Sequence, residues 1–528
     1  MIREDVLQSF PDLFGTKTIN SRQINVEEAI STLTRELRPD ITAALTARRV
    51  LLQSHAPVRE KYAWPKWDDT FEDPVTGQFW TFRQIVQGLI DNFLGRDSAW
   101  RWRLNDEIPI PADAHPLRNP GLELTGPWHP LDMAFNALNS AAPMNMPDFE
   151  DASPAHFQPD GTLKKEPVGV FAALQNAKDI FEGTWMDRPY EVVKKGQPRS
   201  YRISRPPAHW PTRFVRPPGI HVQFDHITVA GEPVPGVIAV AVLWALNNYT
   251  PLARAGTGVY YYIPKLQTPQ EAVVIEKLLA RLEGLIGVRP GTFKIKVLYE
   301  EGTAGRFLPA IAWALRRRLL GTNVGRWDYL GSLIEMWKDD PQGLYPDPQS
   351  IGMASPTMIA YQRYNALMML MAGMKAGEFS QSAPIGGMAA VMIYPATDPY
   401  GRSRYNPLAL RAMVSDKLRE RLLGLIFVPE GSLATNQRPA LEDILASRVK
   451  GQLYDAYRQS WVASPEPAYV AGGNAPLQAP LAGLQAMLDA PQQTVDVNGK
   501  PVPTVGSGVV EAERRLLQAC GVLNSEGR

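Results

Sequence analysis

Two acidic residues, each at the end of an apolar run, are the first indication of chemistry in this sequence. Glu300 ends the run Val297-Leu298-Tyr299-Glu300, and Asp328 follows 28 residues later in Gly325-Arg326-Trp327-Asp328-Tyr329. Each run is typical of a short buried strand, and a helical pattern separates the two. If both strands belong to one parallel α/β barrel, their carboxyl ends open onto a common face. Two carboxylates there can hold a hard cation such as Mg²⁺ and leave positions open for the oxygen atoms of a substrate.

An arginine would complete such a site by neutralising charge that develops on a carbonyl oxygen. Arg216, in Val215-Arg216-Pro217-Pro218-Gly219, is the best placed residue for this role. The competing interpretation is that Glu300 is a solvated acid and Asp328 a helix N-cap. The residue types alone leave both interpretations open.

Hydrophobic periodicity predicts the elements that position these residues. Residues 1–115 are expected to form an N-terminal helical region, and short apolar runs alternate with helix-like stretches over 116–432. This alternation predicts an α/β fold, a TIM (β/α)8 barrel. Residues 433–528 are expected to form a shortened, mostly helical region with loops and a helix at Leu441–Val462. The expected barrel strands are Met144–Phe149, Arg213–Arg216, Val259–Pro264, Lys294–Glu300, Arg326–Tyr329, Ser350–Ala354, Ala383–Met388 and Leu425–Val428.

Composition excludes several classes of function. The 55 Lys and Arg residues balance 54 Asp and Glu residues, so charge gives no argument for binding nucleic acid or an anionic membrane. Cys520 is the single cysteine, which excludes an internal disulfide framework and a cysteine metal cluster. The longest strongly apolar stretch, Gly236–Leu246, has 11 residues and is too short to span a bilayer. The first residues carry acids and no apolar signal core, so we expect a cytoplasmic protein of unspecified oligomeric state.

A series of short motifs, in order along the chain, is similar to the sequence blocks of one enzyme family. The clearest of them are Ile110-Pro111-Ala112-Asp113, Asp148-Phe149-Glu150-Asp151, Arg216-Pro217-Pro218-Gly219-Ile220-His221, Tyr260-Tyr261-Tyr262-Ile263-Pro264-Lys265, Gly291-Thr292-Phe293-Lys294, Gly325 through Tyr329 and Gly386-Gly387-Met388-Ala389-Ala390. Together they resemble malate synthase of the A type. The resemblance runs from the N-terminal helices to about residue 430 and implies that family's barrel fold.

The resemblance also implies an activity. Malate synthases condense acetyl-CoA with glyoxylate in a Claisen reaction, with Mg²⁺ held by one Glu and one Asp. The resemblance places Glu300 and Asp328 in the positions of these ligands. It places Arg216 in the position of the catalytic arginine, which stabilises the enolate of the acyl thioester.

The substrates implied by the resemblance are a small 2-oxo acid, such as glyoxylate, and an acyl-CoA. A 2-oxo acid chelates a divalent cation through its carboxylate and carbonyl oxygens, which polarises the carbonyl for attack. Gly325, Arg326 and Trp327 are expected beside this acid. The acyl-CoA is expected to contact three further residues, Pro356, Gly386 and Gly387. The last two glycines suit close backbone approach to a ligand, although tight helix–strand packing explains them equally well.

The chain departs from the family pattern where the family has its general base. The eighth strand of the family normally reads Asp-Gly-Thr-Trp-Val-Ala-His-Pro, whereas the segment here, Gly424–Glu430, lacks the histidine. The family's Glu-Asp-Ala-Ala-Thr-Ala-Glu-Ile segment is missing, and its base aspartate falls at or next to Asn474. An amide cannot accept a proton from the α-carbon of a thioester, so ordinary malate synthesis should be crippled. Asp443 and Asp489 are the acids that could substitute, and a solvated helix face explains Asp443 better.

Other polar clusters offer no rival chemistry. His209, His221 and His226 lack metal-ligand spacing with a third partner. The phosphate loop, the dinucleotide glycine fingerprint and the Gly-x-Ser-x-Gly motif are all absent from the sequence. The run Arg316-Arg317-Arg318 lies at the end of a predicted helix. It is expected to complement the helix dipole or to form a solvated face, with a CoA contact as the alternative.

Two hypotheses from different classes follow. The first is an enzyme that keeps Mg²⁺ and a 2-oxo acid but has altered its acyl partner or its reaction, for example a C–C lyase or hydrolase of a specialised biosynthetic pathway. The second is an inactive binding or scaffold protein that retains only the barrel. We favour the enzyme, because a protein free of catalytic selection has little reason to keep Arg216, Glu300 and Asp328 together.

Overall fold

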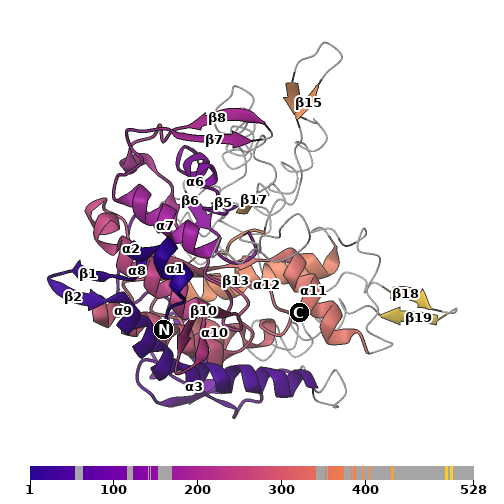
Figure 1. The fold of residues 1–528 in the computed structure, drawn as a ribbon. Coiled ribbons are helices and arrows are strands. Elements are labelled where there is room, and N and C mark those ends of the chain that lie inside the picture. The colour runs from indigo at the N-terminus through magenta and orange to yellow at the C-terminus, as the bar shows by residue number, and fades with distance from the viewer. Residues whose placement is uncertain are drawn as a thin grey trace.

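The structure, a computed structural model, describes most of the chain as far as Trp337 and shorter pieces beyond it (Figure 1). The described residues are 1–53, 63–115, 123–140, 142, 144–152, 169–194, 196–339, 351, 355–373, 382, 384–387, 395–397, 403–405, 430–432, 494–497 and 500–503. The helix predicted at Leu441–Val462 and the residues Asn474, Asp443 and Asp489 lie outside this set, so they stay predictions.

The N-terminal residues form helices and short antiparallel hairpins around the barrel. These elements are α1 (Glu4–Ser9), α2 (Pro11–Phe14), β1 (Thr16–Ile19), β2 (Arg22–Asn25), α3 (Val26–Gln53), β3 (Thr70–Glu72), β4 (Phe79–Thr81) and α5 (Phe82–Phe93). The start of α3 is fixed by Asn25, whose side-chain oxygen accepts a 2.8 Å hydrogen bond from the Glu28 N–H. Thr81 and Gln84 cap α5 reciprocally.

Parallel strands at the centre of the molecule form the barrel sheet. They are β5 (Glu123–Gly126), β6 (Met144–Pro147), β9 (Thr212–Arg213), β12 (Tyr260–Ile263), β13 (Lys294–Tyr299), β14 (Leu319–Val324) and β17 (Glu430–Ser432). The parallel pairings run in the order β17–β5–β6–β9 and β12–β13–β14.

Isolated parallel bridges make this series continuous. The bridge Val215–Tyr261 joins β9 to β12, and the bridge Asn323–Ile385 extends the sheet beyond β14. The pairing that would close the ring, between the segment at Ile385 and β17, is not among those of the described residues. The order of the strands is that of a βα barrel, in which the last strand lies beside the first.

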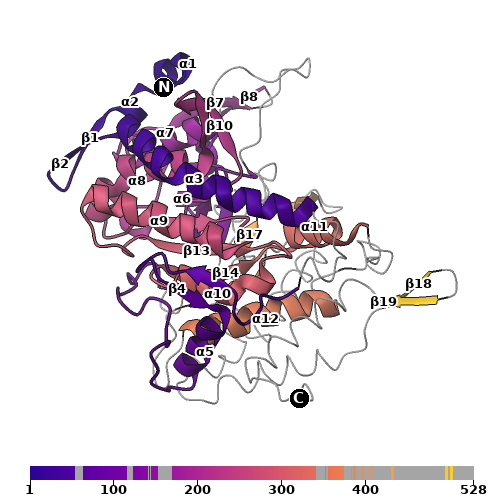
Figure 2. The same cartoon turned by 90° about the horizontal axis from the view of Figure 1, so that it is seen from below.

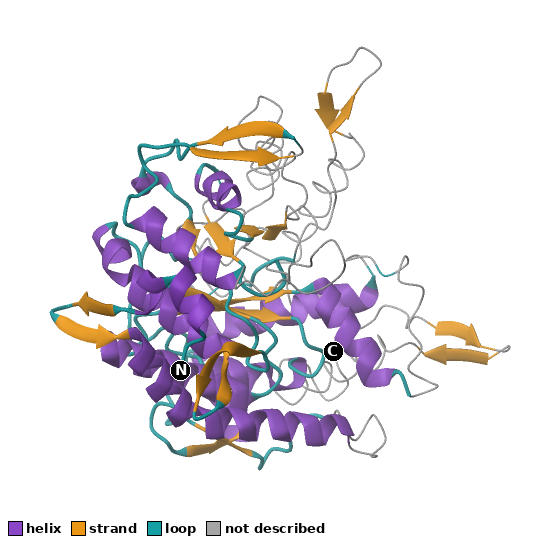
Figure 3. Ribbon diagram, viewed as in Figure 1, coloured by secondary structure: helices purple, strands orange, loops and turns teal. Residues whose placement is uncertain are grey.

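Helices connect successive strands and cover the sheet (Figures 1 and 3). They are α6 (Leu131–Leu138), α7 (Val170–Phe181), α8 (Gly236–Arg254), α9 (Pro269–Ile286), α10 (Leu308–Ala314), α11 (Arg326–Trp337) and α12 (Pro356–Gly373), with short 3-10 turns η1 (Pro207–His209) and η2 (Gly305–Phe307). The remaining strands pair in antiparallel hairpins: β7 (Tyr190–Lys194) with β8 (Gln197–Tyr201), β10 (Gln223–Val229) with β11 (Glu232–Pro235), β15 (Pro395–Thr397) with β16 (Ser403–Tyr405), and β18 (Thr494–Val497) with β19 (Lys500–Pro503).

The core lies between the strands and the helices around them. Every residue of β12, β13 and β14 is buried, as expected for parallel strands covered on both faces. Helix α3 packs along α9, where Lys277 Nζ lies 3.0 Å from an Asp40 oxygen (Figure 2). Among the described residues, α8 is the one helix long and apolar enough to cross a membrane, but 78% of that stretch is buried inside the protein, as in the core helix of a globular fold.

The structure confirms several predicted strands and corrects others. The predictions near β6, β9, β12 and β13 are right to within a few residues, and Ile385 lies within the predicted Ala383–Met388. The strand predicted at Arg326–Tyr329 is wrong, because these residues form the first turn of α11, and the strand before it is β14. The sequence analysis missed β5, whose Glu-Leu-Thr-Gly sequence has a single large apolar residue. The predictions Ser350–Ala354 (Ile351 apart) and Leu425–Val428 lie outside the described residues.

The prediction of a solvated face for the arginine run is wrong for Arg318, whereas Arg316 donates at 3.0 Å to the Trp313 carbonyl in the last turn of α10, in agreement with the predicted helix-dipole role. The run does follow a helix, α10, but Arg318 is fully buried and pairs with Glu276 at 2.5 Å and Glu283 at 3.1 Å, both on α9. Arg316 pairs with Asp73 at 2.9 Å and Arg317 with Glu107 at 3.3 Å. These arginines therefore hold α9 and the N-terminal segments against the barrel.

Candidate active site

Charged residues follow directly on neighbouring barrel strands. Asp148 follows β6, Arg216 lies shortly after β9, Lys265 after β12 and Glu300 after β13. Because these strands are parallel and paired in this order, all four residues lie at the same edge of the sheet. Asp328, in the first turn of the helix that follows β14, joins them there.

Arg216 is buried in a cage of carboxylates. Its Nε and Nη2 donate to the two oxygens of Asp148 at 2.8 and 2.5 Å, a two-point contact that fixes the plane of the guanidinium. Nη2 also donates to Asp151 at 3.0 Å, and Nη1 lies 3.9 Å from Glu150 Oε2. Burial acts to lower the pKa of Arg216, but the charge and hydrogen bonds of Asp148, together with the charges of Asp151 and Glu300, outweigh it and the net pKa is raised. Arg216 is therefore a fixed, permanently charged group.

Glu300 and Asp328 are joined through Lys265. The backbone N–H of Lys265 donates to Glu300 Oε1 at 2.9 Å, and its Nζ donates to Asp328 Oδ2 at 2.6 Å. Nζ also lies 3.9 Å from Glu300 Oε1 and 3.9 Å from Asp151 Oδ2. The backbone of Lys265 has φ of +56°, a left-handed conformation that is uncommon outside glycine and that aims its N–H at Glu300.

The two acids share the site unequally. Burial raises the pKa of Glu300 well above its ordinary value, which Lys265 and Arg216 oppose and a hydrogen bond with the Asp328 carboxyl group reinforces. Burial also acts to raise the pKa of Asp328, but the hydrogen bond and charge of Lys265, with smaller contributions from Glu300 and Arg216, together outweigh it, so that pKa is lowered. A carboxyl pair in contact retains one proton more readily than either acid alone, and the opposite directions of the two pKa shifts distinguish Glu300 from Asp328.

Gly325 is necessary for this arrangement. A Cβ at this position would lie 2.6 Å from the Cβ of Glu300 and 2.9 Å from its Oε2, which is closer than side chains approach one another. Gly325 is also the N-cap of α11, so the positive end of that helix's dipole lies next to Glu300. The dipole favours an anion at this end of the site.

A cluster of buried tyrosines fixes the positions of the residues next to the two acids. The Tyr361 hydroxyl donates to the carbonyl of Tyr299, the residue before Glu300. The Tyr361 ring stacks on Tyr329, the residue after Asp328, with ring centroids 3.8 Å apart. Helix α12 thereby ties the end of β13 to the start of α11, and the separation of the two acids is set by packing.

The remaining predicted residues lie around this centre in different ways. Arg326 donates to the carbonyl of Ile351 at 2.8 Å and stacks over the ring of Trp327 at 4.4 Å, and Trp327 is 53% exposed. The carbonyl of Gly386 accepts from Asn323 at 3.2 Å, which favours packing over ligand approach at that glycine. Gly387 is buried beside it, and Pro356 is the first residue of α12.

Two further acids with raised pKa values lie close to these residues. Burial raises the pKa of Glu150, whose Oε1 accepts from the Gly219 N–H at 2.9 Å. Burial raises the pKa of Glu271 to about 7, and Arg48, 3.9 Å away, only partly offsets this. Glu271 lies in the first turn of α9, where it accepts from the Gln267 N–H at 2.6 Å, so its position has a structural explanation.

The structure thus brings together Arg216, Glu300, Asp328 and Gly325, with Asp328 on a helix and not at a strand end, and their roles in binding stay predictions. It adds Asp148, Asp151 and Lys265, which the sequence analysis quoted only within motifs. Their signal was the same as that of Glu300, a charged residue directly after a predicted strand. The ring of His226 lies 3.0 Å from Asp225, outside this group. His221 lies nearer, beside Gly219, and burial, with the charges of Arg48 and Lys265, lowers its pKa.

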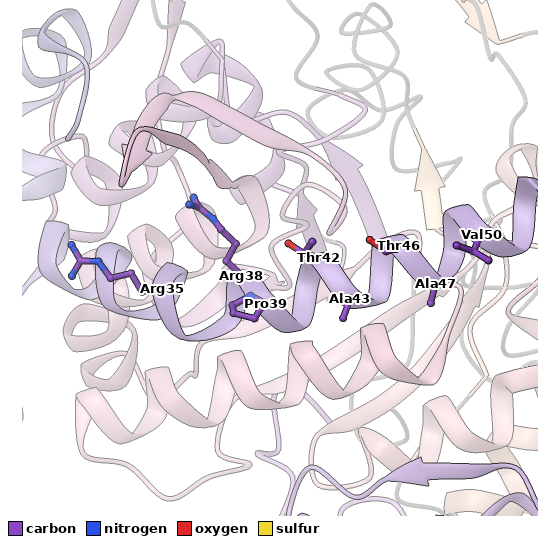
Figure 4. A pocket seen from close by; sticks show the side chains of 8 residues that line it. All are labelled: Arg35, Arg38, Pro39, Thr42, Ala43, Thr46, Ala47 and Val50. Carbon is purple, nitrogen blue, oxygen red and sulfur yellow. The ribbon is translucent and has the colours of Figure 1, made fainter.

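A surface hollow on α3 is separate from these residues (Figure 4). Its lining side chains all come from that helix: Arg35, Arg38, Pro39, Thr42, Ala43, Thr46, Ala47 and Val50. Arg38 is tied to Glu232 at 2.6 Å and to the Pro233 carbonyl at 2.8 Å. Arg38 therefore attaches α3 to the β10–β11 hairpin.

A parallel βα sheet with an arginine, a lysine and several acids at one strand edge defines the class of the protein as a TIM-barrel α/β protein. Comparison with known families agrees. Residues 212–426 match the malate synthase TIM barrel domain. Strands β5 and β6, which pair into the same sheet, precede the matched residues.

More than half of the chain is similar to malate synthases of bacteria and plants. It is 31% identical to malate synthase A of Escherichia coli (strain K12) over 378 residues, which are 70% of this chain and 63% of that protein. It is 31% identical to glyoxysomal malate synthase of Cucumis sativus over 62% of this chain and 51% of that one, and 31% identical to malate synthase of Arabidopsis thaliana over 57% and 48%. The chain spans less than two thirds of the length of these relatives. It is a malate synthase-like protein that contains the barrel domain of that family.

Proposed function

We propose that this protein binds Mg²⁺ and a small 2-oxo acid between Glu300 and Asp328 and carries out Claisen-type carbon–carbon bond chemistry with an acyl-CoA. The observation that carries the proposal is the convergence of Arg216, Glu300 and Asp328 on one edge of the barrel, with Lys265 between the two acids. The similarity to malate synthases supports glyoxylate as the first acid to test.

The residues at this edge fit a divalent cation. Their donors are hard carboxylate oxygens, which Mg²⁺ prefers, and Gly325 leaves the space beside Glu300 Oε2 that a side chain would fill. No group of three or more His, Cys, Asp and Glu side chains is placed to enclose a metal within the described part of the chain. Two carboxylates leave coordination positions for substrate oxygens, and a cation held there would polarise the carbonyl of the oxo acid.

The chain itself supplies orientation and charge. The positive end of the α11 dipole, at Gly325, would favour the carboxylate of the oxo acid. Arg216 would stabilise negative charge on the thioester oxygen as the enolate forms. Asp148 is a positioning residue, since its two hydrogen bonds keep the guanidinium from rotating.

The proton acceptor is where this protein is proposed to differ from its relatives. We place Asn474 at the position of the family's base aspartate, and an amide cannot take the methyl proton of acetyl-CoA. The reaction is therefore proposed to be altered in acyl donor or in chemistry, with malate formation slow or absent. Decarboxylative condensation and retro-cleavage need no strong base and are suited to such a site.

Exchange of acetyl-CoA methyl protons into deuterated water tests this directly, because it reports proton removal separately from condensation. We expect slow exchange, and Mg²⁺-dependent turnover of a 2-oxo acid with a different acyl donor or in the cleavage direction. Rapid exchange that Asp443→Asn or Asp489→Asn abolishes would show that the base is elsewhere and that the protein makes malate. The absence of any Mg²⁺-dependent reaction across a panel of acyl-CoAs would favour the scaffold hypothesis.

A further inference from the structure

Lys265 lies where its ammonium group contacts the same carboxylate as the proposed cation. We propose that Lys265 Nζ competes with the divalent cation for Asp328, so that cation binding moves the lysine side chain off this acid. The inference rests on the proposed cation site and makes Lys265 a positioning residue that sets the affinity of the metal.

The distances require this competition. Nζ lies 2.6 Å from Asp328 Oδ2 and 3.9 Å from Glu300 Oε1. A Mg²⁺ ion bound to both acids would lie about 2.1 Å from an oxygen of each, and therefore within a few ångströms of Nζ. Two positive charges at that separation repel strongly at a partly buried site. The ammonium group and the ion would therefore weaken each other's binding to Asp328.

The side chain has a second acceptor within reach. Asp151 Oδ2 lies 3.9 Å from Nζ, and the Asp151 side chain is 53% exposed, so both partners have room to adjust. A short swing of the flexible lysine stem would bring the ammonium group to Asp151.

The backbone of Lys265 supports the cation site, whereas its side chain competes with the cation. Its N–H donates to Glu300 Oε1 at 2.9 Å and orients that carboxylate. A substitution that keeps a Cβ therefore preserves the orientation of Glu300 and removes only the competing charge. The two contributions of this residue can be separated by mutation.

Titration of MgCl₂ alone by isothermal calorimetry into the wild type, Lys265→Met and Lys265→Arg tests the proposal. We expect Lys265→Met to bind Mg²⁺ at least tenfold more tightly than the wild type, because the positive charge that repels the ion is removed. Lys265→Arg keeps that charge, so its Mg²⁺ affinity should stay within about threefold of the wild-type value. Lys277→Met is the matched control. That lysine also lies 3.0 Å from each of two acids, Asp40 and Glu72, and its removal should leave Mg²⁺ affinity unchanged.

Circular dichroism would show whether Lys265→Met folds. If it does not fold, a second experiment on the wild type still tests the inference. Reductive methylation of Lys265, followed by mass spectrometry, should accelerate at saturating MgCl₂ because the amine leaves Asp328. The inference is overturned if a folded Lys265→Met binds Mg²⁺ no more tightly than the wild type does. It is also overturned if methylation of Lys265 slows when MgCl₂ is added. In both cases the cation site itself stays intact. No Mg²⁺ binding by either protein overturns both the inference and the proposed function.

Discussion

Gly325 and Glu300 are in such close contact that a Cβ on the glycine would lie 2.6 Å from the Cβ of the glutamate. Gly325→Ala is therefore expected to push Glu300 out of position and to destabilise the protein by about 1–3 kcal/mol, the usual cost of overpacking a buried site. Urea unfolding measures the stability, and calorimetry should show that Mg²⁺ binding is lost.

Gly331→Ala is the matched control, because Gly331 lies in the same helix and a Cβ there would meet nothing within 4 Å. Alanine is the better helix former, so this change should be neutral or stabilising by up to about 1 kcal/mol. If both alanine variants kept full Mg²⁺ binding, Gly325 would have no role in forming the site.

The buried pair of Arg216 and Asp148 is expected to contribute strongly to stability as well as to chemistry. Arg216→Met leaves Asp148 uncompensated, and breaking a buried ion pair from one side costs about 3–5 kcal/mol. Arg281→Met removes an exposed pair with Glu36 at 3.3 Å and should cost less than about 1 kcal/mol. Equal losses of unfolding free energy in the two variants would show that the site does not depend on the Arg216 contact.

Local sequence patterns predicted the barrel well where strands are buried and rich in β-branched or aromatic residues. Strand β13 is such a case, and its end at Tyr299 places Glu300 correctly. The pattern failed at Arg326–Tyr329. These residues form the first turn of α11, and their aromatic side chains resemble those of a short strand when the packing of α12 against them is unknown. It failed at β5, whose stability comes from pairing with β6 and β17.

The site was predictable only in part, because its contacts join distant segments. Arg216 and Asp148 are 68 residues apart, and no local pattern pairs them. Arg318 illustrates the same limit, since a run of three arginines is usually solvated, yet its partners Glu276 and Glu283 come from α9. A charged residue can be predicted to be buried only when a residue of opposite charge is known to lie beside it in the folded protein.

Glu271 should make the stability of the protein fall as pH rises towards neutrality. Its pKa is about 7 in the folded protein against an ordinary value of 4.5, so its stabilising contribution is complete below about pH 4.5 and is lost as pH rises through about 7. The shift corresponds to about 3 kcal/mol. Relative to the wild type, Glu271→Gln should therefore gain stability between pH 5 and 8, as measured by urea unfolding.

Glu335→Gln, at an exposed acid, is the control for this pH series. Its stability relative to the wild type should show little dependence on pH, because its side chain is exposed and its ion pair with Lys338 lies at the surface. A difference between wild type and Glu271→Gln that stays constant from pH 5 to 8 would contradict the raised pKa.

Asn474 provides a gain-of-function test of the proposed loss of the base. If this residue occupies the position of the base aspartate, Asn474→Asp should accelerate exchange of acetyl-CoA methyl protons by about 10²–10⁴-fold, the usual contribution of a general base. Asn474→Gln has no carboxylate and should exchange as slowly as the wild type. An unchanged rate in Asn474→Asp would place the missing base at another position.

Mg²⁺-dependent binding of glyoxylate tests the central claim most directly. With Mg²⁺ and glyoxylate both present, the melting temperature of the wild type should rise, because a ligand at 100 times its Kd stabilises the folded state by about 2.7 kcal/mol. Glyoxylate without Mg²⁺ should have little effect, and Asp328→Asn should abolish the shift. If calorimetry detects no Mg²⁺-dependent binding of glyoxylate or of any other small 2-oxo acid to the wild type, the site assigned to Glu300 and Asp328 does not exist.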